Sequence, residues 1–252
     1  LGRSDDYHLF LRRSLNDRNL YNPALGLMNG KTSDGNWAPI GGGKDDNQNR
    51  SVSGWTEGDA WVYTWSPLHD QAGLLELMGD AENYSKKLDQ HFSGGHNVHS
   101  NEPSHHYGYL YDFGGQPWKT QAKVREIAAK EYEATPGGLD GDDDCGQMSA
   151  WLLFTALGFY PVNPASGDYM IGSPMFPQIS LTLANGKTFR VEAEKNAAKN
   201  VYIQSATLNG KDLIIPVVSW EQIQAGGVLH FVMGPNPSKW AGAWGPSPNA
   251  AN

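Results

Sequence analysis

Residues 138–151 read GLDGDDDCGQMSAW, an acidic loop followed at once by the start of an apolar helix. Four carboxylates fall within five residues there, at positions 140 and 142–144. Carboxylates this close together repel one another unless a cation, a helix N-terminus or a positively charged reacting group balances them. The stretch therefore predicts a functional loop, followed by a helix over residues 145–157 that is apolar almost all round and hence buried.

The spacing of these carboxylates suggests a general base. In extended backbone, Asp142 and Asp144 project to one side while Asp143 points away. An ionised pair ahead of a helix N-terminus can accept a proton from water. The alternative is a solvated turn in which Asp144 caps the helix. An EF-hand is excluded, because Cys145 and Trp151 stand where that loop needs glycine and glutamate.

Working outward from this loop, the first 160 residues are predicted to be mainly helical. The segment 28–54 is rich in Gly, Asn, Asp and Ser and is predicted to be a long loop, which in compact domains is often functional. Helical patterns or helix-start signals occur at residues 5–20, 60–65, 71–78, 81–92, 103–113 and 116–132.

After residue 160 the pattern changes to strands. Residues 179–183 and 188–193 alternate apolar and polar side chains, and Asn185-Gly186 between them favours a two-residue hairpin turn. Residues 201–208 and 228–233 continue this pattern. We therefore expect an α+β fold, with a helical domain over residues 1–160 and a β-rich, sandwich-like region over residues 161–252.

Composition excludes several classes of function. The net charge of −8 leaves no basic stripe for a nucleic-acid partner. No apolar run reaches the roughly 18 residues that a membrane span needs. The only cysteine, Cys145, cannot form an intrachain disulfide, so the redox compartment is not indicated. The chain opens on Leu1 rather than Met and shows no signal peptide, and we expect it to be a piece of a longer protein.

A second motif, WTEGDAWVYTW at residues 55–65, places Glu57 among three tryptophans and a tyrosine. A carboxyl packed against aromatic rings loses hydration, which raises its pKa and suits it to act as a general acid near neutral pH. The alternative is that Glu57 or Asp59 only caps a helix.

A third motif, HSNEPSHHY at residues 99–107, is rich in oxygen ligands of the kind calcium prefers. Zinc is not expected, because His105 and His106 would diverge by about 100° on a helix. One of these histidines is expected to hydrogen-bond a ligand or to pack. The alternative for the whole segment is a capped helix start with Pro103 in its first turn.

These three motifs, with GFYPV at residues 158–162 and GSP at residues 172–174, resemble glycoside hydrolase family 92. The resemblance covers essentially the whole chain, with the motifs in the family's order. It implies the second part of an (α/α)6 barrel followed by a C-terminal β region. It also implies a preceding N-terminal domain, outside this chain, that contributes to the sugar subsite and is therefore an expected partner.

The activity implied by the resemblance is that of a calcium-dependent, inverting exo-α-mannosidase. Its substrate would be terminal α-linked mannose, with the α-1,2 linkage favoured, on oligosaccharides or N-glycans. A periplasmic or secreted location is the expectation from the family. The alternatives are a calcium-dependent carbohydrate-binding module, or a fragment that is inactive without its N-terminal domain.

The resemblance also assigns roles to individual residues. Glu57 is the expected catalytic acid, and Asp142 and Asp144 are the expected general-base pair. Calcium ligands are expected at Asn101, Glu102, Asp144 and the carbonyl of Ser100. Substrate contacts are expected at Glu102, Asn101, His105 and Trp55.

Overall fold

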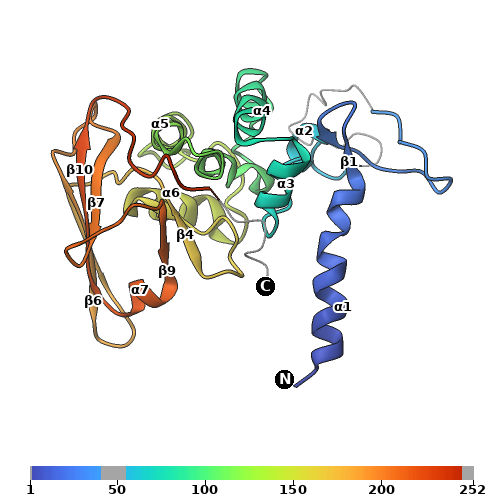
Figure 1. The fold of residues 1–252 in the computed structure, drawn as a ribbon. Coiled ribbons are helices and arrows are strands. Elements are labelled where there is room, and N and C mark those ends of the chain that lie inside the picture. The colour runs from blue at the N-terminus through green and yellow to red at the C-terminus, as the bar shows by residue number, and fades with distance from the viewer. Residues whose placement is uncertain (1, 41–54, 246–252) are drawn as a thin grey trace. The chain divides into compact units, whose positions relative to one another are not determined.

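The structure is a computed structural model that describes residues 2–40 and 55–245, shown as a ribbon in Figure 1. Two compact units are present, one ending at His96 and the other beginning at Asn97. The predicted boundary near residue 160 falls inside the second unit, where helices give way to strands. Most of the predicted long loop, residues 41–54, lies outside the described residues.

The first unit is built from short helices around an aromatic core. Asp59, Asp70 and Asp80 cap its three later helices, each accepting a hydrogen bond from a backbone N–H three residues on. Trp65 and Tyr84 are fully buried and meet edge to face. The elements are α1 (Ser4–Ser14), a 3₁₀ helix (Leu15–Leu20), β1 (Tyr21–Asn22), β2 (Leu27–Met28), α2 (Ala60–Tyr63), α3 (Gln71–Leu77) and α4 (Ala81–Ser93).

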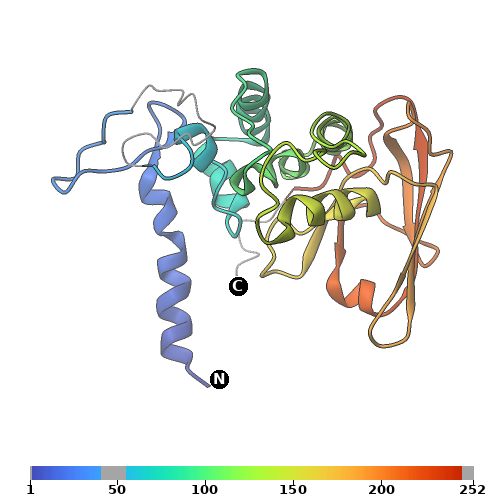
Figure 2. The ribbon, with the colours of Figure 1, turned by 180° about the vertical axis from the view of Figure 1, so that it is seen from behind.

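The helices of the second unit lie beside its strands, as Figure 2 shows from behind. Hydrogen bonds join the helix at residues 117–130 to the β-rich part of the unit. The Gln121 side-chain oxygen accepts from the Ile203 backbone N–H at 2.9 Å, and Arg125 donates to the Pro174 carbonyl at 2.7 Å. The helices are α5 (Pro117–Lys130), α6 (Gln147–Leu157), α7 (Trp220–Gln224) and 3₁₀ helices at Glu102–Ser104, Tyr107–Asp112 and Asp144–Gly146.

One prediction for these helices holds in part and another was wrong. A helix does start at Pro103, but the segment 103–113 forms two short 3₁₀ pieces and not one continuous helix. Helix α6, which packs on α5 and on β3 (Phe159–Tyr160), is not buried all round by the described residues. Met148 and Trp151 lie on the buried face, whereas Leu153 is 68% exposed.

The strands form two sheets in the second unit. One has the order β3-β4-β9, with β4 at Asp168–Ile171 and β9 at Val217–Ser219, and all its pairs are antiparallel. The other has the order β5-β6-β10-β7-β8, and in it β10 runs parallel to β6. Its strands are β5 (Gln178–Thr182), β6 (Thr188–Glu194), β7 (Tyr202–Leu208), β8 (Lys211–Asp212) and β10 (Gly227–Gly234).

The β5–β6 hairpin was predicted correctly, but its turn was not. Leu183 donates to the Lys187 carbonyl at 2.8 Å, so the loop contains three residues rather than two. Only Gly186 there has a positive φ, at 81°, as expected for a type I turn followed by a left-handed residue. The two-residue turn with two positive φ angles occurs instead at Asn209-Gly210, between β7 and β8.

The two sheets share one hydrophobic core. Phe159, Ile171 and Val218 come from the three-stranded sheet, and Phe189 and Phe231 come from the five-stranded sheet. All five side chains are at most 1% exposed. The (α/α)6 barrel remains a prediction, as does the sandwich-like arrangement. Among the residues that the structure describes, no helix is long and apolar enough to cross a bilayer.

Asp112 ends its 3₁₀ helix fully buried beneath α5. Burial raises the pKa of this carboxyl well above its usual value, and a contact with the Thr120 hydroxyl lowers it in part. The folded protein therefore holds Asp112 protonated at pH values where the unfolded chain has lost that proton. This contribution to stability is present below the unfolded pKa of about 4 and is lost as the pH rises towards the folded pKa.

We predict that Asp112→Asn increases stability at pH 8 relative to the unmodified chain, and increases it less at pH 5. The difference should grow by up to about 1.4 kcal/mol per pH unit, because one proton is involved. Urea unfolding at both pH values measures it. Asp212→Asn, at an exposed position on β8, is the matched control and should show no such trend. An Asp112→Asn effect that is the same at both pH values would contradict the burial of a protonated carboxyl.

Candidate active site

The acidic loop connects α5 to α6 and opens with a short hairpin. Tyr132 pairs with Leu139 across it, and Glu133 donates to the Gly138 carbonyl at 2.8 Å. The chain then turns sharply into α6, with φ angles of 53° at Cys145 and 76° at Gly146. Because a non-glycine residue with positive φ is uncommon, Cys145 marks this turn as locally strained.

Within this loop Asp143, not Asp144, anchors the helix start. The Asp143 carboxylate accepts hydrogen bonds from Ser149, at 3.0 Å from its backbone N–H and 2.6 Å from its hydroxyl. These bonds lower the pKa of Asp143. Asp142 and Asp144 flank it, and all three side chains are exposed. The prediction of an Asp144 cap was wrong, since Gly146 occupies the N-cap position and Asp144 lies in the preceding 3₁₀ turn.

The expectation of extended backbone was also wrong. Asp143 has φ −87° and ψ 56°, and Asp144 begins the 3₁₀ turn, so strict alternation of side chains does not apply. The reason is the chain reversal into α6, which an extended segment could not make. Asp143 nevertheless differs in environment from its two neighbours, because only its carboxylate is bonded to Ser149.

The acidic loop lies directly against the segment of the third motif. A Cβ on Gly141 would stand 2.4 Å from the Ser100 carbonyl oxygen, so only glycine allows this approach. Asn101 and Glu102 follow and are half-buried. The helix-start alternative holds in part, since Pro103 lies in the first turn of the 3₁₀ helix, but the side chain of Asn101 at the N-cap position makes no capping hydrogen bond.

A buried polar cluster lies beneath both segments. The Tyr132 hydroxyl donates its hydrogen to the Met148 carbonyl at 3.0 Å. The same hydroxyl lies 2.9 Å from Nε2 of His99. Because the hydroxyl has only one hydrogen, His99 is the donor in this second bond. The Tyr132 ring stacks on Trp151 with 3° between their planes. Burial, and to a smaller extent the neighbouring His105, lowers the pKa of His99 to about 3. His99 is therefore neutral in the fold.

His105 belongs to this cluster. It is only 2% exposed, and its Nε2 lies 3.0 Å from the His99 carbonyl. The Trp151 indole N–H donates to the His105 carbonyl at 2.7 Å. This histidine is packed in the fold, and its expected contact with the substrate stays a prediction. His99 and Tyr132 were missed as residues that support the site. Tyr132 ends the 116–132 pattern, where an aromatic residue looks like an ordinary core position, and His99 begins the third motif without a pattern that indicates its role.

Glu57 lies in the first unit, on the turn that leads into α2. It is exposed and has a φ of 53°. Asp59 rather than Glu57 caps α2, accepting from the Val62 N–H at 2.9 Å. The expected burial of Glu57 among rings was wrong, because this residue is exposed. Trp55 and Tyr63 stack on each other beside it, with ring centroids 5.1 Å apart. Burial raises the pKa of Tyr63, and the nearby charge of Glu57 raises it further.

The predicted residues thus fall into two groups. Ser100, Asn101, Glu102 and the acidic loop are neighbours in the second unit, whereas Trp55 and Glu57 belong to the first. The second-unit group offers carboxylate, amide and carbonyl oxygens, a donor set that suits calcium. Across the described ranges 2–40 and 55–245, no three His, Cys, Asp or Glu side chains are grouped to hold a metal ion. The predicted calcium set includes only two such side chains, so calcium remains a prediction.

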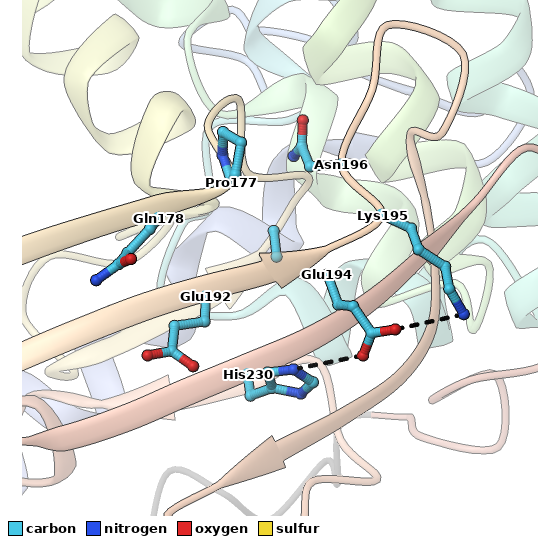
Figure 3. A pocket seen from close by; sticks show the side chains of 8 residues that line it. Pro177, Gln178, Glu192, Glu194, Lys195, Asn196 and His230 are labelled. Carbon is cyan, nitrogen blue, oxygen red and sulfur yellow. Dashed lines mark ion pairs between the residues drawn. The ribbon is translucent and has the colours of Figure 1, made fainter.

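A separate depression of about 350 Å³ opens on the polar face of the five-stranded sheet. Glu194 lies there between His230 on β10 and Lys195 (Figure 3). One of its carboxylate oxygens is 3.9 Å from Nε2 of His230, and the other is 3.4 Å from Nζ of Lys195. Its lining among the described residues includes no tryptophan, tyrosine or phenylalanine on which a sugar could stack. The described lining also includes none of the predicted site residues.

Comparison with known proteins identifies relatives of this chain. The sequence model of the glycosyl hydrolase family 92 catalytic domain matches residues 1–235. A protein of Arthroderma benhamiae described as an uncharacterized secreted glycosidase is 30% identical over 187 residues, which are 73% of this chain and 24% of that protein.

Solved structures agree with this match. A family GH92 α-mannosidase of Bacteroides thetaiotaomicron, in complex with mannoimidazole, is 37% identical with a TM-score of 0.88, over 96% of this chain and 34% of that protein. A family GH92 inverting mannosidase of the same organism is 36% identical with a TM-score of 0.86, over 96% of this chain and 36% of that protein. The chain thus spans about a quarter to a third of these relatives, and it corresponds to their C-terminal part.

We predict that Gly141→Ala destabilises the second unit by about 1–3 kcal/mol, because the added methyl overlaps the Ser100 backbone. Gly137→Ala is the matched control, since a Cβ there meets nothing within 4 Å, and it should change stability by no more than about 0.5 kcal/mol. Urea unfolding measures both. Equal stabilities of the two variants would mean that the acidic loop does not rest on Ser100.

Proposed function

Because the chain belongs to glycoside hydrolase family 92, we propose that it supplies the acid and base residues of an inverting exo-α-mannosidase. The substrate we propose is terminal α-linked mannose on oligosaccharides or N-glycans, with the α-1,2 linkage favoured. The names of the two Bacteroides thetaiotaomicron relatives support the mannosidase activity, and one of them supports inversion. We also propose export from the cytoplasm, since the Arthroderma benhamiae relative is described as secreted.

The proposed base is the pair Asp142 and Asp144. The observation that carries this proposal is that the three neighbouring aspartates differ in their hydrogen bonds to the start of α6. All three aspartates are exposed, and among them Asp143 alone is bonded to Ser149 at the start of α6. Exposed carboxylates beside a fixed helix start can accept a proton from a water that attacks the sugar. The buried cluster around Trp151 holds this loop from below.

The proposed acid is Glu57, which donates its proton to the glycosidic oxygen as the bond to the leaving sugar breaks. Two features support this role. Asp59 caps α2, so Glu57 is not needed there, and its positive φ is an uncommon backbone conformation of the kind found at functional sites. Inversion requires space for the attacking water, so the acid and base carboxyls must stand about 6.5–9.5 Å apart in the active enzyme.

Calcium fits the oxygen donors of the second unit. We propose that Asn101, Glu102, Asp144 and the Ser100 carbonyl hold it, since Gly141 brings the acidic loop against Ser100. When bound, calcium would supply positive charge to hydroxyl oxygens of the sugar. Asn101 and Glu102 would also contact the substrate, and Trp55 would offer a ring face to it. His105 would act indirectly, by supporting Trp151.

The rest of the family fold is proposed to complete the sugar subsite. This chain covers 34% and 36% of the two solved relatives, so most of each lies outside the matched region. We therefore expect the isolated chain to be inactive, and every activity measurement below uses the family-length protein.

We predict that Glu57→Gln lowers the turnover of mannobiosides about 10²- to 10⁴-fold, because the amide cannot protonate a poor leaving group. Turnover of a substrate with a good leaving group should fall much less. Product configuration followed by NMR with mannobioses of each linkage measures turnover, inversion and preference together. Glu82→Gln on α4, at another exposed glutamate, is the matched control and should leave turnover unchanged. A Glu57→Gln enzyme of normal activity on mannobiosides, or a product that retains configuration, would refute the proposed chemistry.

We predict that Glu102→Gln weakens calcium binding at least tenfold, because it removes one of the two carboxylate ligands. Isothermal titration with calcium chloride after chelation measures the affinity directly. Glu133→Gln, which lies on the hairpin before the acidic loop and is exposed, should bind calcium as the unmodified protein does. Identical affinities in all three proteins would remove the site from Glu102.

A further inference from the structure

Asp143 bonds to the start of α6 with both its backbone and its side chain. Its carbonyl accepts from the Gly146 N–H at 2.8 Å, and its carboxylate accepts from the N–H and the hydroxyl of Ser149. N–H groups in the first turn of a helix have no carbonyl partner within the helix, so the carboxylate satisfies one of these donors. The bonds from Ser149 also close residues 143–149 into a ring of chain, and Asp144 lies inside it.

This arrangement differs from the ordinary aspartate caps of the first unit. Asp80 occupies the N-cap position of α4 and accepts from the Asn83 N–H, three residues on, at 2.7 Å. Asp143 instead lies three residues before the N-cap Gly146, and it accepts from a residue six positions on. Capping a helix does not require this reach. The bonds therefore fix the turn at residues 144–146 as well as the start of the helix.

The opposite side of the acidic loop is held as well. Gly141 rests against the Ser100 carbonyl, where a Cβ would stand 2.4 Å from the oxygen. The carboxylates of Asp142 and Asp144 thus lie on a short span of chain that is fixed near both of its ends. One end is fixed by the contact with Ser100, and the other by the bonds of Asp143 to α6.

We propose that Asp143 is a positioning residue for the general base. Through its bonds to Ser149, it sets the direction of the two carboxylates beside it and takes no proton itself. This inference rests on the proposed function of Asp142 and Asp144. A general base must lie within hydrogen-bond reach of the attacking water, and a misplacement of about 1 Å can lower a rate about 10²-fold.

Turnover of mannobiosides by the family-length protein at saturating calcium tests the role. Asp143→Ala should lower kcat about 10- to 100-fold, because the base is then misdirected. Its KM should stay within about threefold, because the base acts in the transition state and the proposed substrate contacts lie elsewhere. Asp80→Ala, which removes an exposed aspartate cap from α4, is the matched control and should leave kcat unchanged.

The conservative variant separates the bond from the charge. In Asp143→Asn the amide oxygen can accept from the Ser149 N–H, and the Ser149 hydroxyl can accept from the amide nitrogen. This variant should therefore keep kcat within about threefold of the unmodified protein, whereas Asp143→Ala should not. A loss in Asp143→Asn as large as in Asp143→Ala would overturn the positioning role, since the charge and not the bond would then matter.

Amide hydrogen–deuterium exchange at Ser149 measures the bond without measuring hydrolysis. Exchange there should be about tenfold faster in Asp143→Ala than in the unmodified protein, because the N–H has lost its acceptor. Far-UV circular dichroism shows whether that variant is folded. If it is not, Ser149→Ala removes only the 2.6 Å hydroxyl bond and should still lower kcat about fivefold.

Two further outcomes would overturn the inference. One is unchanged exchange at Ser149 in folded Asp143→Ala. The other is faster exchange with normal kcat, which would reduce Asp143 to a helix cap. Glu57→Gln in the same assay keeps this failure distinct from failure of the proposed function. Normal turnover by Glu57→Gln would refute the proposed chemistry, whereas a loss there beside a fully active Asp143→Ala would refute only the positioning role.

Discussion

The second unit depends on the hydrogen bond from the indole N–H of Trp151 to the backbone carbonyl of His105, at 2.7 Å. It joins two segments 46 residues apart in sequence, the first turns of α6 and the turn that follows Asn101 and Glu102. Both groups are buried, so an unmade bond here would leave two polar groups without water or a partner. Tyr132 packs flat against the same indole and fixes the Met148 carbonyl, so one aromatic cluster holds both candidate site segments.

The sequence predicted regular elements well where hydrophobic period and turn chemistry agree. Helices over 71–77, 81–93 and 117–130 and strands over 178–182, 188–194, 202–208 and 227–234 all lie where the patterns placed them. The prediction was wrong where a tertiary contact decides. Asp143 takes the role expected of Asp144, because the left-handed residues Cys145 and Gly146 redirect the chain. No local pattern distinguishes among three consecutive aspartates.

The candidate site was predictable as a list of residues but not as an arrangement. Its motifs identify the acidic loop and the Ser100–Glu102 segment, yet their contact depends on the missing side chain of Gly141, which is seen only in three dimensions. The neutral state of His99 likewise follows from burial under Trp151 and not from its neighbours in sequence. Glu57 illustrates the reverse error, since aromatic neighbours in sequence suggested burial although those rings pack on each other.

The position of β10 has a consequence for how this protein is made. It comes last in sequence among the described strands, yet it lies between β6 and β7, and its parallel pairing with β6 cannot form through a simple hairpin. Until residues 227–234 have been synthesised, β6 and β7 therefore each lack a neighbour on one edge, and the core residues Phe189 and Ile203 on them stay uncovered there. Exposed apolar strand edges are prone to aggregate, so this sheet is most vulnerable during synthesis in the interval before β10 is available.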